Sequence, residues 1–233
     1  MAYVCKWYDT LTRNWRAANS DETFKRFFFA NFLVCFIVHY CIVYWLTLNS
    51  SRPGPTIDDP VYNLLTPHDF SIPIFFFTYT AVITFLLHIA QYPLLIHRAF
   101  TAFVSIFAVR ALCIYLIPLS PSPGIIVLTD PMTNALAHES NILNDLFFSG
   151  HIADLSLFFL LSRSISLKRY IALCIAIVGT LLIWQRVHYT IDVLAAPFFA
   201  YAGYWIFVEK DIIWSSYLKK PEFVQNEDCL SES

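Results

Sequence analysis

One apolar run constrains the fold of this chain more than any other feature of its sequence. The run FFFANFLVCFIVHYCIVYWLTL, from Phe27 to Leu48, contains no Asp, Glu, Lys or Arg. At ~1.5 Å per residue, a helix of this length crosses the roughly 30 Å hydrocarbon core of a bilayer. Across the chain, 58% of the residues are hydrophobic and only 14% are charged, which differs strongly from a soluble domain. We therefore predict an integral membrane protein.

Further apolar runs predict that the membrane domain is a bundle of six transmembrane helices. Loops rich in Pro, Gly, Asn and Asp, or short basic turns, separate these runs. The run at 170–185 is short for a span, and we expect it to lengthen through its flanks. The expected fold class is an all-α, multi-pass membrane protein. After the first run, the expected spans are 72–92, 99–117, 146–162, 170–185 and 190–208.

The two ends of the chain are expected to lie outside the hydrocarbon core. Residues 1–26 combine Lys and Arg with Trp7, Tyr8 and Trp15, a mixture that suits an interfacial segment in the headgroup region. Residues 209–233 are predicted to form a polar cytoplasmic tail. We expect residues 27–208 to form a single six-helix membrane domain between them.

The distribution of positive charge predicts how the bundle is oriented, because Lys and Arg are retained on the cytoplasmic side. Almost all of them fall in the N-terminal segment, the turn at Arg98, the turn at 163–169 and the C-terminal tail. Six spans with both termini in the cytoplasm satisfy this distribution. The segments before His151 and His188 would then lie together on the non-cytoplasmic side, whether extracellular, periplasmic or lumenal. The Lys and Arg outside these four segments are Arg52, Arg110 and Arg186.

Composition also narrows the partners that we expect. The net charge of −2 gives no basic field for nucleic acid. The six cysteines are scattered, mostly within apolar runs, and their spacing matches neither a metal site nor a compact disulfide framework. We therefore expect no metal, no cofactor and no nucleic acid, and we expect the partners to be membrane lipids.

A histidine and an aspartate at the start of the last expected span form the first candidate site. His188 and Asp192 are four residues apart, so on a helix they lie on one face and can form a hydrogen bond. A carboxylate on one ring nitrogen fixes the tautomer and leaves the other nitrogen free as a nucleophile or base. The structural alternative is an Asp that favours the helix N-terminus beside an interfacial His.

A second histidine, His151, follows Ser149 and Gly150 at the start of another expected span. Glycine permits a close backbone approach, and the free N–H groups of a helix N-terminus favour an anion such as phosphate. An ordinary loop-to-helix turn is the alternative. Asp145 lies near enough in sequence to hold His151, although it stands in a loop where simple solvation is the alternative.

Arg110 is a charge within an expected span. Such a charge is costly in hydrocarbon and usually faces a partner or a cavity. We expect it to bind a phosphate, and extension of its side chain to the interface is the alternative.

These segments together resemble the sphingomyelin synthase-related branch of the type 2 phosphatidic acid phosphatase (PAP2) superfamily. That branch has one segment of the form C-G-D-x-x-x-S-G-H-T and a later one of the form H-Y-T-x-D-V-x-x-A. LNDLFFSGHI places Asp145, Ser149, Gly150 and His151 in register with the first. HYTIDVLAA matches the second at His188, Tyr189, Thr190, Asp192, Val193 and Ala196. VRALCIYLIPLSPSPG is similar to the family segment in which an arginine precedes a Pro-rich turn, which would place Arg110 in the headgroup site.

The chain also departs from the pattern of this family. Ile152 follows His151 where the family usually has Thr or Ser, so a hydroxyl that could bind phosphate is missing. Asn144 stands where the branch often has Gly. The longer phosphatase motifs of the superfamily are absent, and we expect Arg186 to substitute for their positive charge.

The resemblance implies a PAP2-like helix bundle and a lipid phosphotransferase. His188, oriented by Asp192, would attack the phosphorus of a phospholipid headgroup and form a phosphohistidine. His151 would protonate the departing lipid and then deprotonate the acceptor, a lipid alcohol such as ceramide or diacylglycerol. The alternatives are a phosphatase or phospholipase C-like hydrolase, in which water takes the phosphoryl group, and an inactive membrane scaffold. The implied phosphate-binding residues are Arg110, Asp145, Ser149, Gly150, Arg186 and Tyr189.

Overall fold

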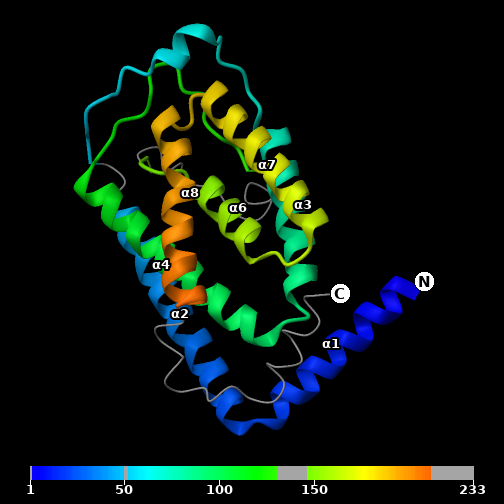
Figure 1. The fold of residues 1–233 in the computed structure, drawn as a ribbon. Helices are drawn as coiled ribbons and strands as arrows, with labels where there is room; N and C mark the ends of the chain where they lie inside the picture. Colours follow the sequence, from blue (N-terminus) through cyan, green and yellow to red (C-terminus); the bar gives the residue numbers. More distant parts are fainter. Residues whose placement is uncertain (1, 50–51, 131–145, 211–233) are drawn as a thin grey trace.

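The computed structural model describes residues 2–49, 52–130 and 146–210 of the 233-residue chain. Within these residues the secondary structure is helical, with seven α-helices and no strand. Figure 1 shows an elongated bundle, with the N-terminal helix diverging from one end and long loops at the other. The expected all-α architecture is confirmed for the part of the chain that the structure describes.

Five helices are long and apolar enough to cross a membrane, which supports the multi-pass prediction. A sixth apolar helix, α6 (Gly150–Leu161), has 12 residues and is therefore only about 18 Å long. It is shorter than the roughly 30 Å of a hydrocarbon core. The five long helices are α2 (Glu22–Asn49), α3 (Ser71–Ile89), α4 (Pro93–Leu116), α7 (Ile165–Trp184) and α8 (Thr190–Tyr204), which continues into the π-helix η2 (Trp205–Glu209).

Some helix boundaries differ from those expected, and local capping explains the differences. α7 begins at Ile165 rather than at 170, because the Ser164 hydroxyl accepts a hydrogen bond from the Leu167 N–H. α4 begins at Pro93, a residue suited to a first helical position. α6 begins at Gly150 rather than near Leu146, because the backbone before it is irregular.

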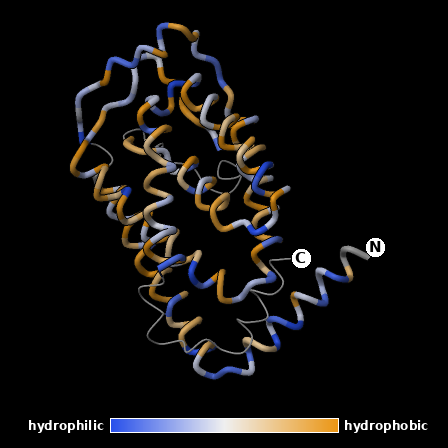
Figure 2. Tube along the Cα trace, in the orientation of Figure 1, coloured by the Kyte–Doolittle hydropathy of each residue, from blue (hydrophilic) through white to orange (hydrophobic). Residues whose placement is uncertain are grey.

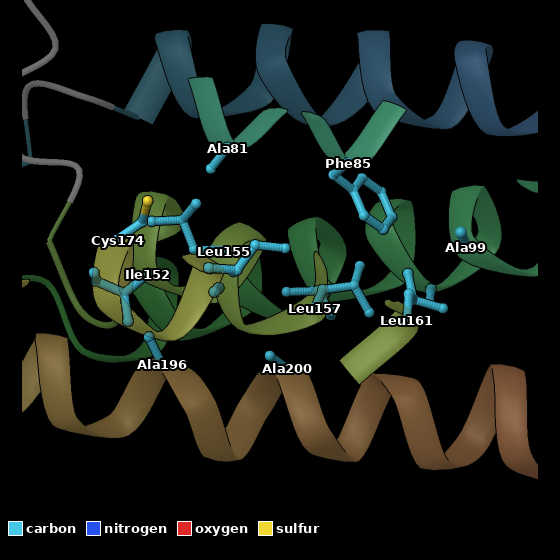
Figure 3. Close-up of a cluster of buried hydrophobic side chains, with 14 of the residues drawn as sticks. Ala81, Phe85, Ala99, Ile152, Leu155, Leu157, Leu161, Cys174, Ala196 and Ala200 are labelled. Atoms are coloured by element: carbon cyan, nitrogen blue, oxygen red, sulfur yellow. The ribbon is translucent and has the colours of Figure 1, made fainter. Parts of the chain in front are cut away.

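The short helix α6 lies at the centre of the bundle, where other helices enclose it (Figure 1). Its side chains Ile152, Leu155 and Leu157 are almost completely buried. Figure 3 shows them between α3 on one side and Ala196 and Ala200 of α8 on the other. Small residues allow helix backbones to approach closely. The enclosing helices therefore cover α6 even though α6 is too short to cross a bilayer alone.

The outer surface of the bundle is apolar, as contact with lipid requires. Figure 2 shows hydrophobic residues along the length of the spans. The effect is strongest on α2, where Phe29, Phe36 and Tyr40 are at least 60% exposed. In water such a surface would be a large unpartnered patch, whereas in a membrane it contacts acyl chains.

The N-terminal helix α1 (Ala2–Ser20) is held against the turn between α3 and α4. The Trp7 and Trp15 indoles donate hydrogen bonds to the carbonyls of Leu87 (3.0 Å) and Ala90 (2.8 Å). The last carbonyls of a helix have no partner within the helix. α1 therefore satisfies the C-terminal end of α3.

A buried polar cluster joins α2 to α4. The Asn31 amide lies 3.2 Å from His97 Nδ1 and donates to the Thr101 hydroxyl at 3.0 Å. All three residues are at most 8% exposed. Because α2 otherwise presents mainly apolar side chains to lipid, this cluster fixes which face of α2 meets α4.

We predict that Asn31→Ala weakens the contact between α2 and α4. Interhelical hydrogen bonds in membranes contribute about 0.6 kcal/mol on average and up to about 1.7 kcal/mol, so the free energy of unfolding should fall by about 1 kcal/mol. Reversible unfolding in mixed micelles measures this change. Cys41→Ala, an exposed position on the same helix, is the control and should leave the stability unchanged. An equal effect of both substitutions would contradict the role of the cluster.

Candidate active site

The two histidine segments meet at one end of the bundle. Ser149 and Tyr189 are the residues that precede the first turns of α6 and α8. The Ser149 N–H donates a hydrogen bond to the Asp192 carbonyl at 3.1 Å, and the Phe148 and Phe199 rings stack at 4.3 Å. The start of α6 therefore lies directly against the first turn of α8.

His188 and Asp192 lie next to each other, although the hydrogen bond that their spacing predicts is not formed in the structure. His188 Nδ1 lies 3.5 Å from Asp192 Oδ2, and both side chains are buried. This distance is longer than an ordinary hydrogen bond, and His188 Nδ1 has no hydrogen-bond partner among the described residues. Asp192 Oδ2 also accepts from the Tyr189 N–H at 3.2 Å, which fixes the carboxylate at the helix start. The carboxylate faces Nδ1, so Nε2 is the nitrogen available for chemistry.

Both histidines follow unusual backbone. Arg186, shortly before His188, has a φ of 60°, and Phe147 and Phe148, shortly before His151, have φ values of 75° and 31°. Non-glycine residues rarely adopt this left-handed region, which costs of order 1–3 kcal/mol each and often occurs at functional sites. The strain re-aims the chain as it enters α6 and α8.

Arg110 of α4 lies against the turn that precedes His151. It is only 5% exposed, and its Nε donates to the Phe148 carbonyl at 3.0 Å. A Cβ atom added at Gly150 would lie 3.4 Å from Arg110 Cζ. The structure therefore brings the predicted intramembrane arginine into contact with the serine-glycine-histidine segment.

His151 contacts α3, and the neighbouring Ser149 side chain is buried. The His151 ring contacts Phe75 of α3 edge-on, at a centroid distance of 5.9 Å. The Ser149 hydroxyl is buried and has no hydrogen-bond partner within the described part of the chain. Asp145 lies outside the described residues, so its contact with His151 stays a prediction.

The Ile152 side chain packs against α7. Its side chain is 1% exposed, and its Cδ1 atom lies 3.5 Å from the position of a Cβ added at Gly179 of α7. A Thr or Ser at this position would place its side chain at the contact between α6 and α7. The side chain at this position therefore contributes to the packing of α6 against α7.

Arg186 connects two outer loops. Its Nη1 donates to the Pro123 carbonyl at 2.8 Å, and its Nη2 donates to the Tyr62 carbonyl at 3.0 Å. The guanidinium also lies over the Tyr62 ring, 5.2 Å from its centroid. These contacts hold the loops over the start of α8, and phosphate binding by Arg186 stays a prediction.

Two tyrosines support the same loops. The Tyr189 hydroxyl donates to the Ser120 carbonyl at 3.0 Å and accepts from the Ile57 N–H at 3.3 Å. The Tyr62 hydroxyl donates to the His188 carbonyl at 2.9 Å. Burial raises the pKa of Tyr62, and the nearby charge of Asp59 adds to the effect. Tyr62 therefore stays a neutral donor, whereas contact between Tyr189 and phosphate stays a prediction.

Asp59 is a buried residue that the sequence analysis did not assign. Its carboxylate accepts hydrogen bonds from the Thr190 N–H at 2.6 Å, the Thr190 hydroxyl at 3.1 Å and the Val61 N–H at 3.0 Å. It therefore caps both the 3₁₀-helix η1 (Pro60–Leu64) and the start of α8. An Asp directly before a Pro is a recognisable sign of a helix start. The contact with α8 is tertiary and has no local signal.

Comparison with known families is consistent with this geometry. Residues 144–209 match the family model described as PAP2 superfamily C-terminal. This match supports the resemblance of the chain to the PAP2 superfamily. The matched segment contains both histidines and Asp192, whereas Arg110 lies before it. It supports a membrane lipid phosphatase- or phosphotransferase-type fold. No curated protein and no solved structure matches the chain.

We predict that Asp59→Ala destabilises the protein by about 1–3 kcal/mol, because charge-assisted caps of helix N-termini contribute this much. Thermal unfolding in detergent would measure the loss as a lower Tm. Asp58→Ala changes the neighbouring exposed carboxylate and should leave the Tm unchanged. A similar Tm for the two variants would contradict the capping role of Asp59.

Proposed function

We propose that the protein is a lipid phosphotransferase that moves a phospholipid headgroup to a lipid alcohol through a phosphohistidine. The observation that carries this proposal is the contact between the two helix starts. The Ser149 N–H donates to the Asp192 carbonyl and so joins the start of α6 to the first turn of α8. A helix start favours an anion, and a carboxylate next to an imidazole favours its use as a nucleophile. Ceramide and diacylglycerol are the acceptor lipids that we expect.

In the first step, His188 Nε2 attacks the phosphorus of the donor lipid. A P–N bond forms, the bond between phosphorus and the diacylglycerol oxygen breaks, and His151 gives its proton to the departing oxygen. In the second step, His151 takes the proton of the acceptor hydroxyl, whose oxygen forms a new P–O bond as the P–N bond breaks. General acid–base catalysis of this kind contributes about 10²–10⁴-fold.

The phosphoryl oxygens would be held by charge and by backbone N–H groups. Arg110 lies within contact of Gly150, so its guanidinium and the free N–H groups at the start of α6 converge on one location. The buried Ser149 hydroxyl would gain a partner there. Asp145, Tyr189 and Arg186 complete the proposed phosphate-binding set.

Hydrolysis by the same residues is the second candidate function. Water would then take the phosphoryl group from His188, as in a phosphatase or a phospholipase C-like enzyme. An inactive scaffold is the third candidate, and the Ile152 that replaces the usual Thr or Ser favours it. The match of HYTIDVLAA to the transferase branch favours transfer over hydrolysis.

We further propose that α6 is the fourth of six membrane passes and that both termini are cytoplasmic. The proposal is supported by the positions of Lys and Arg along the chain. The active site would then face the non-cytoplasmic side of the membrane.

Vesicles that contain the purified protein and headgroup-labelled phosphatidylcholine or phosphatidylethanolamine test the activity. We expect labelled product that depends on added ceramide or diacylglycerol, and an acid-labile label on the protein itself. His188→Ala should abolish both signals, and Asp192→Asn should lower the rate by about 10²–10⁴-fold. The control His68→Ala changes an exposed loop histidine and should retain activity. Water-soluble label without acceptor dependence would indicate hydrolysis, and identical wild-type and His188→Ala profiles would refute catalysis.

One introduced cysteine tests the orientation. Thr129 is exposed in the loop before the site, so Thr129→Cys in a Cys5→Ser, Cys229→Ser background should react with an impermeant maleimide added outside intact cells. The wild-type protein, which keeps Cys5 and Cys229 and has Thr at position 129, should react only after permeabilisation. Protection of the cysteine at 129 until permeabilisation would reverse the assigned orientation.

A further inference from the structure

The mechanism above leaves one acidic residue of the central helix without a role. Asp154 is the only Asp, Glu, Lys or Arg in α6, and its side chain is partly buried. Within residues 2–49, 52–130 and 146–210, no group forms a hydrogen bond with its carboxylate. An ionisable group inside a membrane bundle is costly and is usually retained for function.

The helical spacing places Asp154 on the face of α6 that carries the site. Gly150, Asp154 and Phe158 follow at intervals of four residues, and His151 lies three residues before Asp154, so all four share one face. The Arg110 guanidinium lies against Gly150 at one end of this face and interacts electrostatically with the Asp154 carboxyl.

The other end of the face is closed by aromatic packing. The Phe158 ring stacks on Phe85 of α3 at 4.3 Å. Asp154 therefore lies between Arg110 at one end of this face and the apolar Phe85–Phe158 contact at the other. It is about 4.5 Å deeper along the helix than His151, because three residues separate them.

Depth decides which part of a substrate would meet this carboxylate. The chains of a lipid alcohol stay in the hydrocarbon, whereas its reacting hydroxyl must reach His151 at the helix start. The polar atoms next to that hydroxyl would therefore lie one helical turn deeper in the membrane than His151, at the level of Asp154. In its ionised form the Asp154 carboxyl accepts hydrogen bonds and donates none.

Two kinds of lipid alcohol differ in the hydrogen-bond donors that they carry next to the reacting hydroxyl. A ceramide-type lipid has an amide N–H and a second hydroxyl beside the reacting one, and either can donate to a carboxylate. A diacylglycerol has only ester oxygens there, which leave the carboxylate without a partner. Sites built to bind a donor reject analogues that lack it more strongly than apolar pockets reject an extra methylene.

We propose that Asp154 selects the acceptor lipid: it favours a lipid alcohol with an N–H or O–H donor beside the reacting hydroxyl over diacylglycerol. This inference rests on the proposed transferase function. The competing role for Asp154 is that of a counter-ion that only holds Arg110 in place. That role would affect folding and all acceptors alike, whereas selection changes the ratio between acceptors.

The test measures kcat/KM for ceramide and for diacylglycerol with one labelled phospholipid donor in the same vesicles. Wild type should prefer ceramide, and Asp154→Asn should lower the ceramide-to-diacylglycerol ratio at least about 10-fold, mainly through the rate with ceramide. Asp58→Asn makes the same change at an exposed loop residue and should keep the wild-type ratio. A ratio that Asp154→Asn leaves unchanged would overturn the selection role and leave the transferase function standing.

A second measurement needs no variant at position 154, so it also holds if Asp154→Asn fails to fold. Ceramide with an N-methylated amide and a methylated second hydroxyl keeps the reacting hydroxyl but loses both neighbouring donors. Wild type should use it at least about 10-fold less efficiently than ceramide, whereas diacylglycerol transfer stays the same. Equal kcat/KM values for the methylated ceramide and for ordinary ceramide would overturn the proposal. Transfer to neither acceptor would instead overturn the proposed function.

Discussion

The site depends on the hydrogen bond between the Ser149 N–H and the Asp192 carbonyl. This bond joins two helix starts that are far apart in sequence. Around it, Arg110 reaches the turn before α6, and the Asp192 carboxylate faces His188. If this contact were lost, the start of α6 and the first turn of α8 would each remain helical but would no longer be held side by side.

The loops at the same end of the bundle stabilise this contact from outside. Asp59 caps α8, Tyr62 holds the His188 carbonyl, and Arg186 joins both loops through backbone carbonyls. These contacts satisfy polar groups that would otherwise be orphaned at a helix start. They also offset the cost of the left-handed backbone at Arg186.

The sequence was most informative where a local pattern determines the outcome. The apolar runs predicted the long helices, and the four-residue spacing predicted the pair of His188 and Asp192. Helix starts were less accurate, because the Ser164 cap of α7 depends on side-chain geometry. Asp59 was missed because its partner Thr190 is distant in sequence. The orientation of Ile152 toward α7 likewise depends on packing, which no single sequence displays.

The enclosure of α6 has a consequence for how the protein responds to its membrane. Bilayers differ in thickness, and lipid-facing helices adjust to a mismatch by tilting or by extending their flanking residues. Helices such as α2 and α3 have much of their surface exposed to lipid and would make that adjustment. α6 is surrounded by protein, so hydrophobic mismatch acts on it only through its neighbours. α8 is as exposed to lipid as α3 and is hydrogen-bonded to the start of α6 through Ser149, so a tilt of α8 would reach α6 at this contact.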